Sequence, residues 1–138
     1  MSSRPDSEEP STSSGIVTKA SPSSVTATVA RLVALVESKG MNVFAVIDHS
    51  GEAERVGMAL RETTVVIFGS PKAGTPVMQA VALAALDLPL RVLIWDDDGH
   101  TRVSYTAPGA LAARYAIPSA LATNLAGIDA LTDALVSE

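Results

Sequence analysis

The sequence contains no cysteine, and this absence excludes several kinds of site. Disulfides, thiolate zinc sites, iron–sulfur clusters and cysteine nucleophiles all require the missing thiol. A chain without cysteine also fits a reducing compartment, so we predict a cytoplasmic protein.

Basic residues and long apolar runs are also scarce. Ten Lys and Arg stand against fifteen Asp and Glu, which gives a net charge of -5. Because nucleic-acid binding depends on clustered positive charge, we expect no nucleic-acid partner. The longest charge-free runs, residues 73–86 and 115–128, are shorter than the roughly 20 apolar residues of a membrane helix, so we expect no membrane partner.

Aromatic residues make up only 4% of the chain, although 47% of it is hydrophobic. The core must therefore consist of Val, Leu, Ile and Ala. A chain of 138 residues with this composition is long enough for one ordinary domain. Its first residues are rich in Ser, Pro and Glu, so we predict a disordered tail at residues 1–14 and a single domain at residues 15–138.

From Gly15 onward the hydrophobic pattern alternates between strands and helices. Strands are predicted at residues 16–19, 42–48, 64–68, 90–95 and 102–106. A first helix is predicted after the capping residues Pro22-Ser23-Ser24 and ends at Gly40. Further helices are predicted after Ser50, with Ala53, Val56, Gly57 and Leu60 inside, and at residues 75–86, 108–115 and 119–136.

The last two strands face each other across Asp98-Gly99, a hairpin turn signal that makes part of the sheet antiparallel. Residues 64–68 form a continuous apolar run, typical of a strand that is covered on both faces. We therefore predict an α+β fold. It is a two-layer sandwich with a mixed sheet of about five strands and helices packed on one face.

The loop after the third predicted strand has the features of an anion site. Free backbone N–H groups and the helix dipole favour negative charge there. Gly74 would let a ligand approach the backbone, and Lys72 adds a positive charge. In the alternative interpretation the loop is only a well-capped joint, with Thr75 as N-cap and Pro76 at the first helical position. The spacing is not that of a nucleotide-triphosphate loop.

Two histidines lie beside carboxylates, at Asp48-His49 and at the hairpin residue His100. An oriented imidazole could make His49 a general base, although a helix-entry residue bonded to the backbone is the open alternative. The aspartates 96–98 before His100 fit a solvated turn. Neither site has metal-binding spacing, so we expect no metal and no cofactor.

Tyr105 and Arg114 are further candidates. Strand alternation turns the ring of Tyr105 inward, with a hydroxyl that needs a partner. For Trp95, covering the same pocket and covering the core are the two open alternatives. Arg114 could hold a carboxylate or phosphate, and a structural salt bridge is the open alternative.

The residues that carry a family resemblance are spread along the chain: residues 68–78 (FGSPKAGTPVM), residues 86–95 (LDLPLRVLIW), Asp48-His49 with Ala53 and Gly57, Val103-Ser104-Tyr105, and residues 111–114. From about Gly15 to its end, the chain resembles the domain of unknown function 302 family. The resemblance implies a compact α+β domain of the TATA-binding-protein-like group and a homodimer, but no reaction. It directs attention to His49, Lys72, Gly74, Thr75, Tyr105 and Arg114.

The chain departs from the family pattern at several positions. Ser70 stands where Asn is common, Glu62 replaces a Pro, Thr106-Ala107 replaces an Asn-Asp pair, and Tyr115 replaces a His. These changes remove polar groups that could have completed a site. Ala107 also removes a helix cap, which typically costs about 1 kcal/mol.

Three hypotheses follow, in order of preference. The first is a module that binds a small anionic molecule between the Lys72 loop, His49 and Tyr105, in a homodimer. The second is a structural or regulatory homodimeric module for protein interaction. The third is a hydrolase or isomerase with His49 as base. Because adjacent strand residues point to opposite faces, Asp48 is poorly placed to orient that base.

Overall fold

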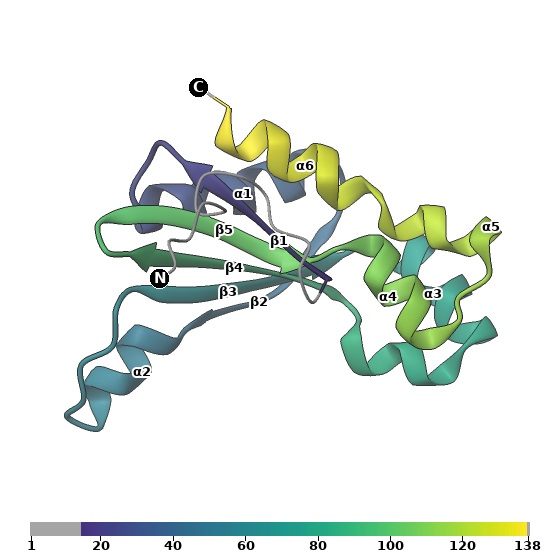
Figure 1. Cartoon of the computed structure of the whole chain (residues 1–138), viewed down its shortest axis with the longest axis horizontal. Helices are drawn as coiled ribbons and strands as arrows, with labels where there is room; N and C mark the ends of the chain where they lie inside the picture. Colours follow the sequence, from purple (N-terminus) through teal and green to yellow (C-terminus); the bar gives the residue numbers. More distant parts are fainter. Residues whose placement is uncertain (1–14, 138) are drawn as a thin grey trace, which may run out of the picture.

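A five-stranded antiparallel sheet is the frame of the structure, a computed structural model that describes residues 15–137 (Figure 1). Its strands are β1 (Ile16–Ser21), β2 (Asn42–Asp48), β3 (Thr63–Gly69), β4 (Leu90–Asp97) and β5 (His100–Thr106). They lie in the order β1-β5-β4-β3-β2, and all four neighbouring pairs are antiparallel. The tail predicted at residues 1–14 lies outside the described residues.

The helices fall into two groups, with α2 apart from both (Figure 1). They are α1 (Val25–Ser38), α2 (His49–Arg55), α3 (Pro71–Ala80), α4 (Pro108–Tyr115), α5 (Ser119–Ala122) and α6 (Gly127–Val136), with 3-10 turns η3 (Ala82–Asp87) and η4 (Thr123–Leu125). The helices α1 and α6 lie over one face of the sheet, whereas α3, α4 and α5 gather beyond one of its ends. No helix in residues 15–137 combines the length and the apolar character needed to cross a membrane.

The α+β class and the number of strands match the prediction, but the expected mixed sheet is wrong. The physical reason lies in the connections. The segments α2 and α3–η3 project from the ends of the sheet instead of crossing its face (Figure 1). Each following strand therefore runs back beside the previous one, and α1 carries the chain from one edge strand, β1, to the other, β2.

Two hydrophobic clusters form the core. The larger one lies between the sheet and the two helices α1 and α6, and its fully buried members include Leu32, Val36, Val66, Phe68, Val92, Ile94, Val103 and Leu135. The smaller one lies among α3, α4 and α5 beyond the end of the sheet, which we call the end group. It contains Val77, Ala84, Leu111, Ile117 and Leu125. Leu90, at the start of β4, packs against both clusters and so marks their boundary.

Local signals predict several elements correctly. Ser24 caps α1 by accepting a hydrogen bond of 3.0 Å from the Ala27 N–H. The hairpin turn has positive φ at both Asp98 (55°) and Gly99 (94°), as a two-residue turn requires.

The helix α2 is shorter than expected and has a different cap. Asp48, not Ser50, is its N-cap, and the helix ends at Arg55 because Gly57 adopts a φ of 78°. Val56 and Leu60, expected on the inner face, are 72% and 47% exposed. The predicted inner stripe is therefore wrong.

The helix α3 begins earlier than predicted. Its N-cap is Ser70 and its first residue is Pro71, so Thr75 is not the cap and Pro76 lies inside the helix. The sequence offers two Ser/Thr-Pro starts five positions apart, and both fit the rules for a helix start. The side chain of Ser70 forms no capping hydrogen bond. The first backbone N–H groups of α3 therefore receive no hydrogen bond from their N-cap residue.

The strand β3 is covered on one face only, although its apolar run is typical of a strand covered on both. Thr64, Val66 and Phe68 are buried, whereas Val65 and Ile67 between them are half-buried. Paired residues place Ile47, Val65, Ile67, Leu93 and Trp95 on the face opposite α1 and α6, which we call the open face. Trp95 donates a hydrogen bond of 3.0 Å to Ser104 Oγ on this face.

Candidate functional site

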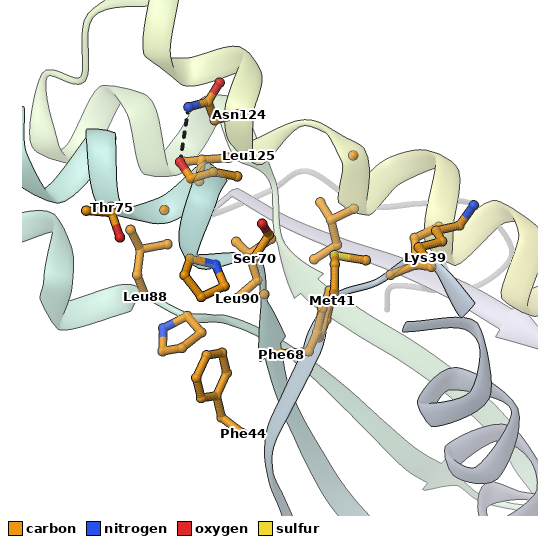
Figure 2. A pocket seen from close by; sticks show the side chains of 18 of the residues that line it. Lys39, Met41, Phe44, Phe68, Ser70, Thr75, Leu88, Leu90, Asn124 and Leu125 are labelled. Carbon is orange, nitrogen blue, oxygen red and sulfur yellow. Dashed lines mark hydrogen bonds between the residues drawn. The ribbon is translucent and has the colours of Figure 1, made fainter. Parts of the chain in front are cut away.

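A cavity of about 620 Å³ lies where the two core clusters meet (Figure 2). Its wall includes Phe68, Ile128 and Leu131 from the larger cluster and Leu125 from the smaller one. It is bounded by the start of α3 and the start of α6, and we call it the α3–α6 cavity. Its volume is within the roughly 300–1,000 Å³ typical of small-molecule sites.

The lining of this cavity is mainly apolar. Its larger apolar residues are Met41, Phe44, Phe68, Met78, Leu88, Pro89, Leu90, Leu125, Ile128 and Leu131. Among residues 15–137, the polar side chains of the wall are those of Ser70, Thr75 and Asn124, and the charged one is that of Lys39. Figure 2 shows Lys39 and Met41 at one end of the cavity and Thr75 and Leu88 at the other. The cavity is therefore an elongated apolar site with the positive charge of Lys39 at one end.

Small residues leave the space that larger ones would fill. Ala73, Gly74 and Gly127 are among the lining residues. A Cβ atom added at Gly74 would meet Met78 Cε at 3.8 Å, an ordinary contact, so this wall can accept more volume. Asn124 Nδ2 donates a 3.0 Å hydrogen bond to the Ala73 carbonyl and so holds η4 against α3 (Figure 2).

The start of α3 adds positive character beside the cavity. Lys72 is exposed and lies between the lining residues Pro71 and Ala73. Within residues 15–137, neither Lys72 nor Lys39 forms an ion pair. The positive end of the α3 dipole also lies beside the cavity, at the start of the helix. In a chain of net charge -5, this is a local excess of positive charge.

The predicted site residues do not share one cavity. Gly74 and Thr75 line the α3–α6 cavity, and Lys72 adjoins it. His49, Tyr105 and Arg114 lie elsewhere, so the hypothesised convergence of His49 and Tyr105 on the Lys72 loop is not found. The part that any of these residues plays in ligand binding stays a prediction.

His49 is exposed and is the first residue of α2. The neighbouring Asp48 carboxylate accepts hydrogen bonds from Ser50 Oγ (2.6 Å) and the Gly51 N–H (3.0 Å), and these lower the pKa of Asp48. Asp48 therefore caps the helix and does not orient His49. Neither described cavity is lined by His49, and residues 15–137 hold no group of three or more side chains suited to a metal.

Tyr105 is only 4% exposed and lies beneath α6. Its hydroxyl donates a 2.5 Å hydrogen bond to Asp129 Oδ1, and Lys19 Nζ stands 5.4 Å from its ring centre. Lys19 donates to Thr132 and Asp133, each at 2.7 Å. Burial and the bond to Asp129 raise the pKa of Tyr105. Burial alone would lower the pKa of Lys19, but the bond to Asp133 and the interaction with Tyr105 outweigh it and raise this pKa. The cluster fastens β1 and β5 to α6.

Arg114 forms the structural salt bridge that was its open alternative. Its Nη1 lies 2.7 Å from Asp87 Oδ2, which also accepts a 2.6 Å hydrogen bond from the Tyr115 hydroxyl. Arg91 donates to the other carboxylate oxygen at 2.9 Å. The bonds from Tyr115 and Arg114 lower the pKa of Asp87 despite its partial burial. A second cavity beside Asp87, of about 30 Å³, has room for about one water molecule.

Sequence reasoning missed most of the cavity wall. Lys39, Met41 and Phe44 come from the α1–β2 turn and the edge strand. Asn124 lies in η4, and Gly127 is the first residue of α6. The one available signal is the pair Asn124 and Gly127, a polar and a small residue next to the apolar stripe of the C-terminal segment.

Comparisons with known proteins agree with this fold. The sequence matches the family described as "Domain of unknown function DUF302" over residues 17–135. A solved structure, the uncharacterized conserved protein DUF302 from Bacillus stearothermophilus, superimposes with a TM-score of 0.75. The match covers 88% of this chain and 95% of that chain, at 17% identity.

Curated relatives are longer than this chain. It is 41% identical over 105 residues to the "Fluoride-specific ion channel FluC 1" of Brucella suis and to that of Brucella abortus. The "Fluoride-specific ion channel FluC 2" of Brucella melitensis is equally similar. Each match covers 75% of this chain but only 39–41% of the relative. The chain thus spans about two fifths of the length of these relatives.

Proposed function

This chain belongs to the DUF302 family, and we propose that it is a module that binds a small anionic molecule in the α3–α6 cavity. The observation that carries the proposal is the cavity itself, which has an apolar wall, a few polar groups and a single cation. Apolar walls supply affinity at roughly 25 cal/mol per Å² of buried surface, and the polar groups orient the ligand.

The charge of the ligand follows from the surroundings of the cavity. Lys39 lines it, Lys72 adjoins it, and the positive end of the α3 dipole faces it, whereas none of the lining residues in the described part of the chain is acidic. Of the residues named from the sequence, Gly74 and Thr75 belong to the proposed site and Lys72 flanks it. His49 lies outside it, and no observation on the described residues favours a catalytic base there.

A pair of substitutions at Gly74 tests this proposal. Ala and Leu both have a helix propensity about 1 kcal/mol better than Gly, but only Leu adds a long side chain beside Met78. We expect a thermal-shift screen with phosphates, nucleotides, small carboxylates and haem to give a ligand for the natural protein and for Gly74→Ala. Saturation a hundredfold above Kd adds about 2.7 kcal/mol, or several degrees in Tm. The same ligand should give no shift with Gly74→Leu.

Two results of the thermal-shift screen would contradict a binding module in the α3–α6 cavity. A ligand whose shift is unchanged in Gly74→Leu binds outside the α3–α6 cavity. A screen without any shift, repeated by NMR titration, removes the support for a binding module and leaves the second candidate.

The open face supports a second candidate, a homodimeric module for protein interaction. Ile47 on this face is 36% exposed, and Val65, Ile67 and Leu93 are half-buried although no helix in residues 15–137 lies along them (Figure 1). Apolar side chains in one surface patch suit a subunit contact.

A charge on the open face tests the dimer. We expect sedimentation velocity to find a dimer at micromolar concentration, and Ile67→Lys to be a monomer because a buried unpaired charge in the contact is strongly unfavourable. Ala113→Lys, on the exposed side of α4, adds the same charge elsewhere and should remain a dimer. A natural protein that is monomeric at micromolar concentration argues against this candidate.

A further inference from the structure

We propose that the ligand of the α3–α6 cavity is an amphipathic monoanion. It has an extended apolar body of about ten to fourteen carbon atoms, and its carboxylate-type head group lies at the Lys39 end. The size follows from the cavity volume of about 620 Å³, which at ~30 Å³ for a water-sized atom corresponds to about 20 non-hydrogen atoms. This inference rests on the proposed function and names the ligand class of the same site.

The apolar body follows from the wall of the cavity. Its polar side chains are few, and the amide of Asn124 is already engaged with the Ala73 carbonyl. A sugar or nucleotide would lose hydration at many polar atoms, each at a cost of about 1–3 kcal/mol when left unpaired. An alkyl chain has no such atoms and covers the walls that Leu88, Leu90 and Leu125 provide.

Two methionines suit an extended chain. Met41 lies near the Lys39 end (Figure 2). Met78 also lines the cavity, and its Cε lies 3.8 Å from where a Cβ atom of residue 74 would be. Their unbranched, polarizable side chains adjust to a flexible ligand at little cost. Lengthwise contact with such a wall favours an elongated body over a compact polar one.

The head group follows from the distribution of charge. Lys39 is the only charged lining residue, it is exposed, and it has no ion-pair partner in the described part of the chain. Figure 2 shows its Nζ atom turned away from the other lining residues, with the aliphatic stem nearer to Met41. A carboxylate at this end keeps its hydration and gains one opposite charge, while the chain extends inward over apolar atoms.

Calorimetric titration of the full chain with four compounds tests the inference. They are decanoate, 1-decanol, decyltrimethylammonium and acetate, each below the concentration at which it forms micelles or separates. We expect decanoate to bind about three- to fivefold more tightly than 1-decanol, the gain of one exposed charge pair. The cationic compound should bind more weakly than 1-decanol. Acetate should show no heat of binding, since it lacks the apolar body.

Substitutions at two basic residues separate the charge from the cavity. Lys39→Met keeps the aliphatic stem, so it should reduce decanoate binding to the level of 1-decanol and leave 1-decanol unchanged. Arg61→Met removes one positive charge from an exposed residue ahead of β3, and should leave both affinities unchanged. Equal binding of decanoate and 1-decanol, or no effect of Lys39→Met, overturns the charged head group but not the binding module.

The remaining outcomes separate this inference from the proposed function. Acetate binding as tight as that of decanoate overturns the apolar body. If no ten-carbon compound binds while another ligand is lost in Gly74→Leu, the ligand class is wrong and the module stands. If no ten-carbon compound binds and the screen also finds no such ligand, both proposals fail.

Discussion

Asp87 is the residue at which three parts of the molecule meet. It is the last residue of η3, and its carboxylate accepts hydrogen bonds from Arg91 in β4 and from Arg114 and Tyr115 in α4. Its side chain is 18% exposed. Because hydrogen bonds to a charged group are stronger than neutral ones, this carboxylate is a fastening point of the end group.

The pH dependence of stability should report this cluster. The pKa of Asp87 is lowered in the folded state, so its contribution is present above the unfolded pKa of about 3.9 and is lost as pH falls through the folded pKa. We expect Asp87→Asn to lower the free energy of unfolding by about 1 kcal/mol at pH 7. The difference should shrink toward pH 3, as measured by urea denaturation.

A control for Asp87 comes from the hairpin turn. Asp98 is exposed, forms no ion pair within residues 15–137, and has a positive φ that Asn tolerates well. Asp98→Asn should therefore change stability little at either pH. An Asp87→Asn deficit of the same size at pH 7 and pH 3 would contradict a role for the charged carboxylate.

For single residues, the sequence predicts which side chains need a hydrogen-bond or salt-bridge partner but does not identify that partner. Tyr105 was expected to turn inward with a hydroxyl seeking a partner, and that partner is Asp129, 24 positions away. The sequence is compatible with either a ligand or a salt bridge for Arg114, and the salt-bridge partner is Asp87, 27 positions away. Local spacing does not encode which helix lies over which strand, so these pairs could not be read from the chain.

Among the elements, α4 has the least favourable end. Its C-cap residue Ala116 has a φ of 51°, in the left-handed region that glycine adopts freely. We expect Ala116→Gly to raise the free energy of unfolding by about 1 kcal/mol, as measured by urea denaturation. The residue is exposed, so no packing contact opposes the change.

The same substitution inside α4 should have the opposite sign. Ala113 is exposed and helical, and Ala113→Gly should lower the free energy of unfolding by about 1 kcal/mol. If both glycine variants destabilise the protein, Ala116 does not hold a strained conformation in solution.

Element boundaries were predictable where one local signal stands alone. Pro108 at the start of α4 and Asp98-Gly99 in the hairpin each have no competitor nearby, and each was predicted correctly. The start of α3 was missed because Ser70-Pro71 and Thr75-Pro76 satisfy the same rule. Propensity decides between such starts only together with tertiary packing.

For the whole molecule, the important division is between the two core clusters. The larger one contains the sheet, and the smaller one holds α3, η3 and α4 around Val77, Leu111 and Ile117. We expect native-state hydrogen exchange to show at least tenfold weaker protection in α3 and α4 than in β3 and β4, because the smaller cluster buries fewer apolar groups. A ligand in the α3–α6 cavity contacts both clusters and should slow exchange in α3.

Two results would contradict this picture. Equal protection of α3 and β3 would mean that the clusters open together. Slower exchange at α2 but not at α3 on ligand addition would place the ligand away from the cavity.

The cavity itself was out of reach of sequence reasoning. Phe68 and Leu125 were predictable as apolar positions of a strand and a helix, but a void arises only from how two clusters fail to fill the space between them. The loop at Gly74 and Thr75 was identified through its anion-site chemistry, and it forms one wall. The opposite wall comes from segments with no functional signature.

The pairing of the first strand with the last has a consequence during synthesis. Thr18 in β1 forms a hydrogen bond with Ser104 in β5, 86 positions later. At 5–20 residues per second, a ribosome needs on the order of ten seconds to make the intervening chain. During this interval β2, β3 and β4 can pair with one another, whereas β1 has no strand to pair with. The nascent protein therefore carries an unpaired edge strand ahead of a nearly complete sheet until β5 is made.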